Sequence, residues 1–173
     1  IQSLFLVDQM TSLAFGSYAF KGLNTLVIAN TSRLSAMDET EKKKMKGAIL
    51  RSALSDYILN QDAYSSLLAK FYQVSRSLSP QKDIYNMYTG QLRQYVTGAD
   101  PDDWEHPTVQ EVGFLDADPG TSYYTPSSTW MDVNMYVEAV YTYSQDEFTQ
   151  LYGKYPYIMQ KYTIIQNIIN SLK

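Results

Sequence analysis

The chain has 173 residues, 45% of them hydrophobic and 18% charged, which is typical of one globular domain and excludes a disordered or low-complexity chain. It has no cysteine and only one histidine, which excludes disulfide scaffolds and thiolate metal sites and disfavours histidine-based ones. The net charge of −4 argues against nucleic-acid binding, and tyrosine is unusually abundant, with 16 residues.

Residues 3–33 are predicted to form one long helix. This stretch contains no proline, and apolar residues recur along it at spacings near three and four: Leu6, Met10, Leu13, Phe20 and Val27. Further apolar residues lie off that stripe. The helix is therefore expected to be contacted on most sides and to lie at the centre of the fold.

A second helix is predicted to begin after Asp38, because Asp38 followed by Glu41 is the pattern of a capping box. The segment 60–62 is expected to divide it from a third helix, with Asp62 as a cap. The apolar positions of the two helices follow near-heptad spacing: Leu50, Leu54, Tyr57, Tyr64, Leu68 and Phe71. Ser79 and Pro80 predict the start of a fourth helix, which is expected to end at Gly98.

Residues 98–128 are predicted to form a long irregular insert. Four prolines punctuate the segment, and seven acidic residues lie between Asp100 and Asp118 with no lysine or arginine among them. Charge is polarised along the whole chain, since residues 1–98 carry +4 and residues 99–173 carry −8. Long connections of this kind are often functional, so the insert is the first place to look for a site.

Helix is predicted to return after Pro126 and to restart at Ser144, where Glu147 completes a second capping box. Gly153 and Pro156 predict another break. The last helix has apolar residues spaced by four, three, four and three positions, which is a short heptad seam: Ile158, Tyr162, Ile165, Ile169 and Leu172.

These elements together predict an all-α fold, an antiparallel helical bundle of four to five long helices with the acidic insert at about 98–128. Residues 1–173 are expected to form a single helical-bundle domain. Because the chain begins with isoleucine, it is interpreted as a fragment excised from a larger protein.

The candidate ligand-binding residues combine aromatic rings with carboxylates in or beside the insert. Aromatic faces and carboxylates suit an organic cation, and hydroxyl-bearing rings also suit small polar molecules. The candidates are Trp104, Phe114, Tyr123, Tyr124, Trp130, Asp116 and Asp118. The alternative is that these rings anchor the insert on the bundle and that the acids are solvated. Calcium binding is left open, although Ser127 stands where a calcium loop would place glutamate.

The first functional hypothesis is an extracytoplasmic ligand-binding sensor domain of a transmembrane receptor, on the extracellular or periplasmic face of a membrane. It follows from the expected pairing of the first and last helices, which would also give a homodimer. Membrane contact is expected only through flanking segments outside this chain.

The alternative hypothesis is a structural or adaptor module that binds another protein through a tyrosine-rich face. An enzyme is the least favoured class, because the sequence lacks a nucleophile elbow, a phosphate-binding glycine loop and di-iron motifs. No catalytic residue, cofactor, metal ion or nucleic-acid partner is predicted.

Overall fold

A computed structural model describes residues 3–7, 19–22, 25–29, 31–76, 113–115 and 129–172. These residues are mostly helical and include one small β-sheet. Two short 3₁₀ turns, η1 and η2, accompany the main elements. The described elements are β1 (Ser3–Val7), β2 (Ala19–Gly22), β3 (Thr25–Ala29), η1 (Thr31–Arg33), α1 (Glu39–Leu59), η2 (Asp62–Tyr64), α2 (Ser65–Arg76), α4 (Thr129–Thr142), α5 (Gln145–Tyr152) and α6 (Pro156–Ser171).

The prediction of a helix over residues 3–33 is wrong, and the fold is therefore not all-α. The described parts of this stretch form a three-stranded sheet in the order β1-β3-β2, with β3 parallel to β1 and antiparallel to β2. Short apolar runs fit a buried helix and a strand equally well by periodicity. Thr25, Val27 and Ile28 are β-branched and favour the strand, because their side chains pack well on a pleated surface.

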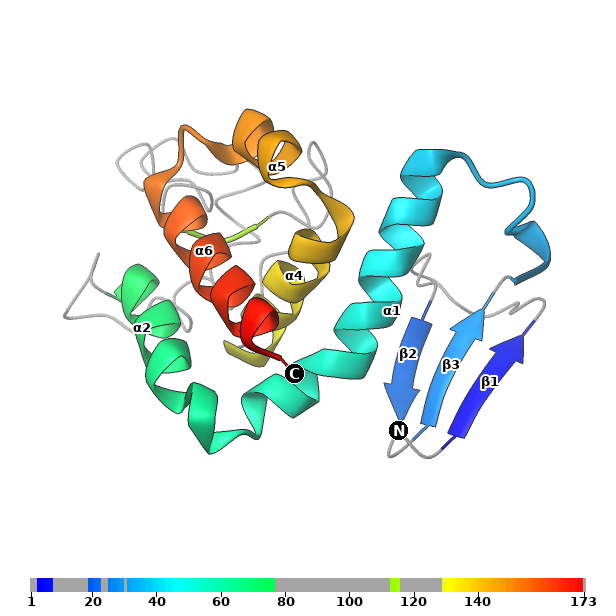
Figure 1. The fold of residues 1–173 in the computed structure, drawn as a ribbon, viewed down its shortest axis with the longest axis horizontal. Coiled ribbons are helices and arrows are strands. Elements are labelled where there is room, and N and C mark those ends of the chain that lie inside the picture. The colour runs from blue at the N-terminus through cyan, green and yellow to red at the C-terminus, as the bar shows by residue number, and fades with distance from the viewer. Residues whose placement is uncertain are drawn as a thin grey trace, which may run out of the picture.

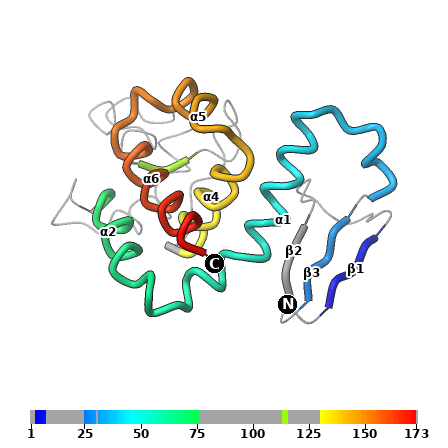
Figure 2. The backbone as a smooth tube through the Cα atoms, in the orientation of Figure 1, coloured from blue at the N-terminus to red at the C-terminus, as the bar shows by residue number. Residues whose placement is uncertain are grey.

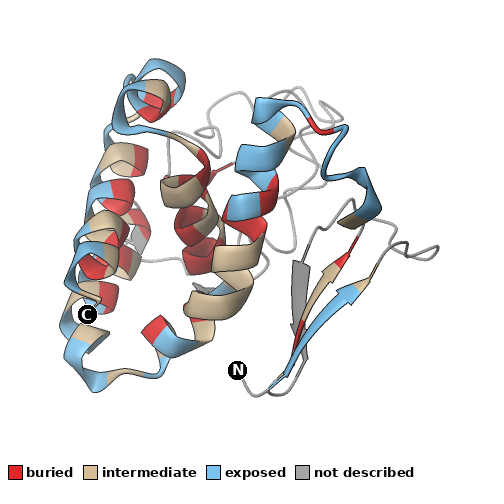
Figure 3. Cartoon of the chain, turned by 45° about the vertical axis from the view of Figure 1, so that its right-hand side comes forward, coloured by how far each residue is buried: buried red, intermediate tan, exposed pale blue. Residues whose placement is uncertain are grey.

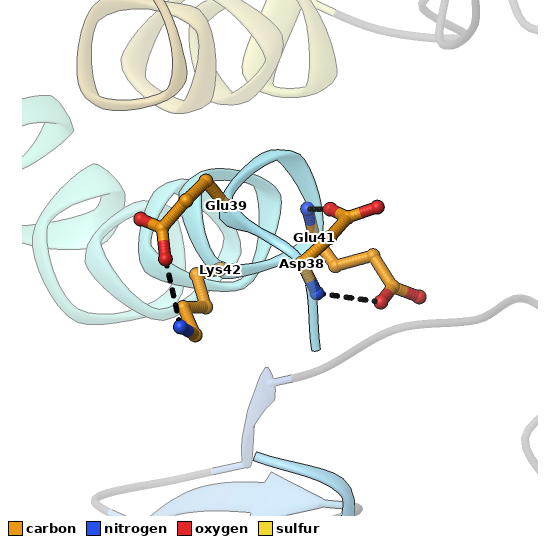
Figure 4. Close-up of polar contacts among 4 residues, drawn as sticks. All are labelled: Asp38, Glu39, Glu41 and Lys42. Carbon is orange, nitrogen blue, oxygen red and sulfur yellow. Dashed lines mark hydrogen bonds and ion pairs between the residues drawn. The ribbon is translucent and has the colours of Figure 1, made fainter. Parts of the chain in front are cut away.

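Helix α1 begins where the sequence predicts. The Asp38 side chain accepts a hydrogen bond from the backbone N–H of Glu41 at 2.8 Å, and the Glu41 side chain accepts one from the backbone N–H of Asp38 at 3.3 Å (Figure 4). Lys42 Nζ also lies 2.8 Å from Glu39 Oε1. The capping box satisfies backbone donors that the first turn leaves without helical partners, which fixes the start of the helix.

The predicted break near residues 60–62 is confirmed. Helix α1 ends at Leu59 and α2 begins at Ser65, with the 3₁₀ turn η2 between them. Asp62 is the first residue of that turn, and its backbone oxygen accepts a hydrogen bond from the Ser65 hydroxyl at 2.8 Å. Leu68 and Phe71 are buried as predicted, whereas Tyr57 is exposed.

The C-terminal helices also follow the predicted boundaries. Ser144 and Glu147 form the second capping box, which starts α5 directly after α4. Pro156 occupies the first turn of α6, where a missing backbone N–H costs nothing. Ile158, Tyr162 and Ile165 of the predicted seam are buried, and Phe148 stacks on Tyr162 with ring centroids 3.8 Å apart.

Helix α1 lies between the sheet and the remaining described helices (Figures 1 and 2). It packs against β2 on one side and against α4 on the other, while α6 packs against α2 and α4. Buried residues concentrate where these helices face one another, and β1 forms a largely exposed outer strand (Figure 3). The main core is thus helical, and the sheet is attached to it through α1.

Two predictions fall mostly or wholly outside the described residues. The helix expected to begin at Ser79 is one of them. The other is the insert at 98–128, of which residues 113–115 are described and lie outside any helix or strand.

Candidate functional site

Five of the seven predicted ligand-binding residues lie outside the part of the chain that the structure describes. They are Trp104, Tyr123, Tyr124, Asp116 and Asp118. The other two, Phe114 and Trp130, are described, and they lie in different surroundings.

Phe114 is fully buried in the helical core. It follows Gly113, whose φ of 85° is a conformation that glycine adopts without strain. The hydroxyl of Tyr136 on α4 donates a hydrogen bond of 2.9 Å to the backbone oxygen of Gly113. This bond and the burial of Phe114 and Leu115 fix residues 113–115 against the helices.

The ring of Phe114 faces a buried ion pair between α6 and α4. Lys161 Nζ lies 2.7 Å from Asp132 Oδ2, and both side chains are completely inaccessible to solvent. The same nitrogen lies 4.5 Å from the ring centroid of Phe114 and 4.8 Å from that of Phe71. Burial lowers the pKa of Lys161, and the neighbouring Asp132 carboxylate partly opposes that effect.

We call Lys161, Asp132, Phe71, Phe114 and Tyr136 the lysine cage. The Tyr136 ring completes it, with its centroid 5.8 Å from Lys161 Nζ. Aromatic faces together with a carboxylate are the combination that the sequence predicted for an organic cation, and Phe114 is common to both. In the lysine cage, however, the cation is a side chain of the protein itself.

The sequence does contain a signal for the lysine cage that the predictions missed. Lys161 lies within the apolar stripe of α6, between the buried Ile158 and Ile165, so its side chain points into the core. Asp132 precedes Tyr136 by four residues and shares its face of α4. A lysine and an aspartate, each on the buried stripe of a helix, predict a buried pair because either charge alone would be costly.

Trp130 lies at the surface, at the start of α4. Its side chain is 54% exposed, and its Nε1–H donates a hydrogen bond of 3.2 Å to Asp56 Oδ1 on α1. Trp130 therefore contacts α1 at the surface, whereas Phe114 lies in the core.

Helices α1 and α4 run in opposite directions, and ion pairs join α1 to α4 and to the neighbouring α5. Arg51 Nη1 lies 2.5 Å from Glu138 Oε2 on α4. Lys43 Nζ lies 2.6 Å from Glu147 Oε1 on α5, near the start of α1. Burial raises the pKa of Glu138, although Arg51 acts in the other direction. A Cβ atom on Gly47 would lie 2.9 Å from the backbone oxygen of Glu138, so only glycine allows this close approach.

Strand β1 presents the largest apolar side chains exposed by the described part of the sheet. Leu4, Phe5 and Leu6 are 57%, 56% and 66% exposed. β1 has β3 on one side and is an outer strand of the described sheet. Ser3–Val7 contains no charged residue and no proline, which are the features that commonly protect edge strands from pairing with another chain.

Most of the described tyrosines contribute to the core instead of forming an exposed face. Tyr136, Tyr152 and Tyr162 are buried, and Tyr57 is 51% exposed. The others are partly buried: Tyr64, Tyr72, Tyr141, Tyr143, Tyr155 and Tyr157. Tyrosine can bury its ring while its hydroxyl reaches a polar partner, which explains how so many fit around one core.

Within the described residues, no group of three or more histidine, cysteine, aspartate or glutamate side chains could hold a metal ion. A search of the same residues found no helix with the length and hydropathy needed to span a bilayer.

Comparison of the chain with known protein families, curated proteins and solved structures found no match.

Proposed function

We propose that this protein is a non-enzymatic interaction module that binds another polypeptide along strand β1. The observation that carries the proposal is the exposure of Leu4, Phe5 and Leu6 on an outer strand. The proposal belongs to the adaptor class, with the sheet edge in place of a tyrosine-rich face as the binding surface.

Strand addition would use both the backbone and the side chains of β1. Since β1 pairs only with β3 among the described strands, alternate N–H and C=O groups point away from β3 toward the incoming strand. An added strand would continue the hydrogen-bonded ladder and cover the exposed leucine and phenylalanine side chains. This is a common way for a folded domain to bind an extended peptide.

Support for this surface comes from its contrast with other exposed positions. The exposed end of α1 carries charged residues, several of them in ion pairs such as those of Lys42 and Lys43. The other large exposed apolar side chains are separated along the chain: Leu34, Tyr57, Trp130 and Leu151. Only β1 places three together in the described residues, and adjoining apolar side chains mark binding sites more often than isolated ones do.

The sensor hypothesis remains a prediction, and the structure removes one of the expectations on which it was based. It depended on a first helix pairing with the last, whereas residues 3–7 and 25–29 form strands and the α6 seam is largely buried within the chain's own core. Ligand binding by the insert at residues 98–128 remains a prediction. We also retain the antiparallel helical bundle as a proposal, which the opposite directions of α1 and α4 support.

Selection from a displayed library of random linear peptides tests the binding function. We expect the wild-type protein to enrich apolar, proline-poor sequences with high strand propensity. These peptides should bind the variant Leu4→Lys/Leu6→Lys at least ~10-fold more weakly in fluorescence anisotropy, because both changes place charges on the docking edge.

The matched control is Leu151→Lys, which adds a charge at an exposed leucine on α5, away from the sheet. It should bind the selected peptides as the wild type does. Equal binding by Leu4→Lys/Leu6→Lys, or the recovery of no binding peptide, would contradict the proposed function.

A further inference from the structure

We infer that the strand added to β1 is the β1 strand of a second copy of this chain, in an antiparallel pair with two-fold symmetry about Phe5. The inference rests on the proposed function and names its partner. It is carried by the side chains of β1, by its neutral charge and by the position of the other sheet edge.

The side chains of β1 are self-complementary in this arrangement. Phe5 lies opposite Phe5 of the second copy, and Leu4 lies opposite Leu6 on both sides of the symmetry axis. Aromatic and aliphatic pairs directly across two strands stabilise a sheet. All three side chains are more than half exposed in the single chain, so each has surface to bury on pairing.

The backbone of β1 permits this pairing whichever of its residues direct their N–H and C=O groups away from β3. Antiparallel strands alternate between hydrogen-bonded and non-hydrogen-bonded residue pairs. If the backbone N–H and C=O groups of Phe5 point toward the second copy, the two Phe5 residues form a hydrogen-bonded pair. If the backbone groups of Leu4 and Leu6 point toward the second copy, the Leu4–Leu6 pairs are hydrogen-bonded instead.

Charge does not oppose a second copy locally at this edge. The protein carries a net charge of −4, so two copies repel at long range, but Ser3–Val7 is uncharged. No like-charged side chains of β1 would meet across the pair, and like charges directly opposite one another would destabilise it.

The position of α1 makes the assembly finite. Helix α1 packs against β2, the strand at the other edge of the sheet, so the sheet has a free edge only at β1 in the described residues (Figure 1). A two-fold pair uses that edge in both copies. The assembly therefore stops at a dimer with a continuous six-stranded sheet instead of growing into a fibre.

The area available makes this dimer weak and reversible. An aromatic side chain buries about 150–250 Å² when fully enclosed, and leucine is smaller, so Leu4, Phe5 and Leu6 leave roughly 100 Å² each to be covered. Two copies would bury roughly 600 Å² through these side chains, against about 1,200–2,000 Å² in a standard stable interface. The association should therefore depend visibly on protein concentration.

Sedimentation equilibrium of the full chain over a range of concentrations tests the pairing and its register. Leu4→Lys/Leu6→Lys places like charges opposite each other and should weaken dimerisation at least ~10-fold. Leu4→Lys/Leu6→Glu instead places each introduced lysine opposite the glutamate of the second copy and should retain the dimer. Both variants change the same two exposed positions, and their unfolding midpoints should match that of the wild type.

A wild-type protein that is monomeric at all concentrations would overturn the inference. So would a dimer that Leu4→Lys/Leu6→Lys leaves intact, or one that both variants lose equally. The peptide selection separates these results from failure of the proposed function. If selected peptides bind β1 while the protein stays monomeric, the docking edge stands and only the second copy is excluded as its partner.

Discussion

Lys161 and Asp132 place two ionisable groups at zero exposure in the middle of the helical core. Removing a charge from water costs several kcal/mol, and the 2.7 Å contact with its partner offsets much of that cost. The rings of Phe71 and Phe114 add favourable contacts with the ammonium group. The lysine cage therefore links α6, α4, α2 and residues 113–115 through one nitrogen.

The substitution Lys161→Met tests this interdependence. It leaves Asp132 in the core without its cation, and we expect the free energy of unfolding to fall by about 3–5 kcal/mol in urea denaturation. Asp132→Leu/Lys161→Met removes both charges, and it should recover most of that loss because a well-packed apolar pair can replace a buried ion pair. A double variant no more stable than the single one would contradict this account of the lysine cage.

Glu147 gives a pH-dependent prediction at a single residue. Hydrogen bonds from Lys43 and then Ser144 lower its pKa from 4.5 to about 2. Its carboxylate therefore contributes stability that is fully present above pH 4.5 and is lost as the pH falls toward 2. The difference in melting temperature between the wild type and Glu147→Gln should be largest above pH 4.5 and should disappear near pH 2. A difference that does not change over this range would show that the charge of Glu147 is not responsible.

At the scale of elements, α1 and α4 approach closely at Gly47, where a side chain would meet Thr142 and Glu138. Gly47, Ala48 and Ser55 are the buried positions along the middle of α1, whereas the predicted position Tyr57 is exposed. The contact was not predictable from an apolar stripe because α1 is contacted on two sides, by the sheet and by α4. Small residues at such contacts carry little hydrophobic signal in the sequence.

Gly47→Ala measures how tight this contact is. In an open helix the change would stabilise by up to about 1 kcal/mol, because alanine has the higher helix propensity. Here the new Cβ would collide with the Thr142 side chain and the Glu138 backbone oxygen, so we expect a net loss of about 1–3 kcal/mol in chemical denaturation. Gly47→Ala/Thr142→Ala should regain part of it, because the nearest atom is gone. A stabilised single variant would mean that the helices separate easily.

Elements that begin with a local sequence pattern were predicted correctly, whereas elements that depend on contacts between distant residues were not. Helix starts at Asp38 and Ser144 were correctly predicted because a capping box is a local pattern whose physics acts within four residues. Strands β1 and β3 were missed because their pairing joins residues 22 positions apart, as in Ser3 with Thr25, and no local pattern records it. The prediction that Phe114 binds a ligand stays a prediction. The cation that the structure places beside its ring is Lys161 of α6, which could be identified only from the packing of the helices.

At the scale of the whole molecule, the exposed apolar side chains of β1 lie apart from the buried apolar side chains of the helical core. The helical core encloses its aromatic and aliphatic side chains almost completely, with Phe71, Phe114 and Ile165 at zero exposure. Strand β1 lies at the outer edge of the sheet, with α1 between the sheet and this core (Figure 3). Changes at β1 are therefore expected to alter association while leaving the stability of the helical core nearly unchanged.

Amide hydrogen exchange across Ser3–Val7, followed by NMR on the full chain, tests the docking edge most directly. In the dilute free protein, amides that bond to β3 should be protected, and the alternate ones that point outward should exchange rapidly. Saturation with a selected peptide, or a high protein concentration if the partner is a second copy, should slow those outward amides selectively. Saturated binding with unchanged exchange at β1 would show that the partner docks elsewhere.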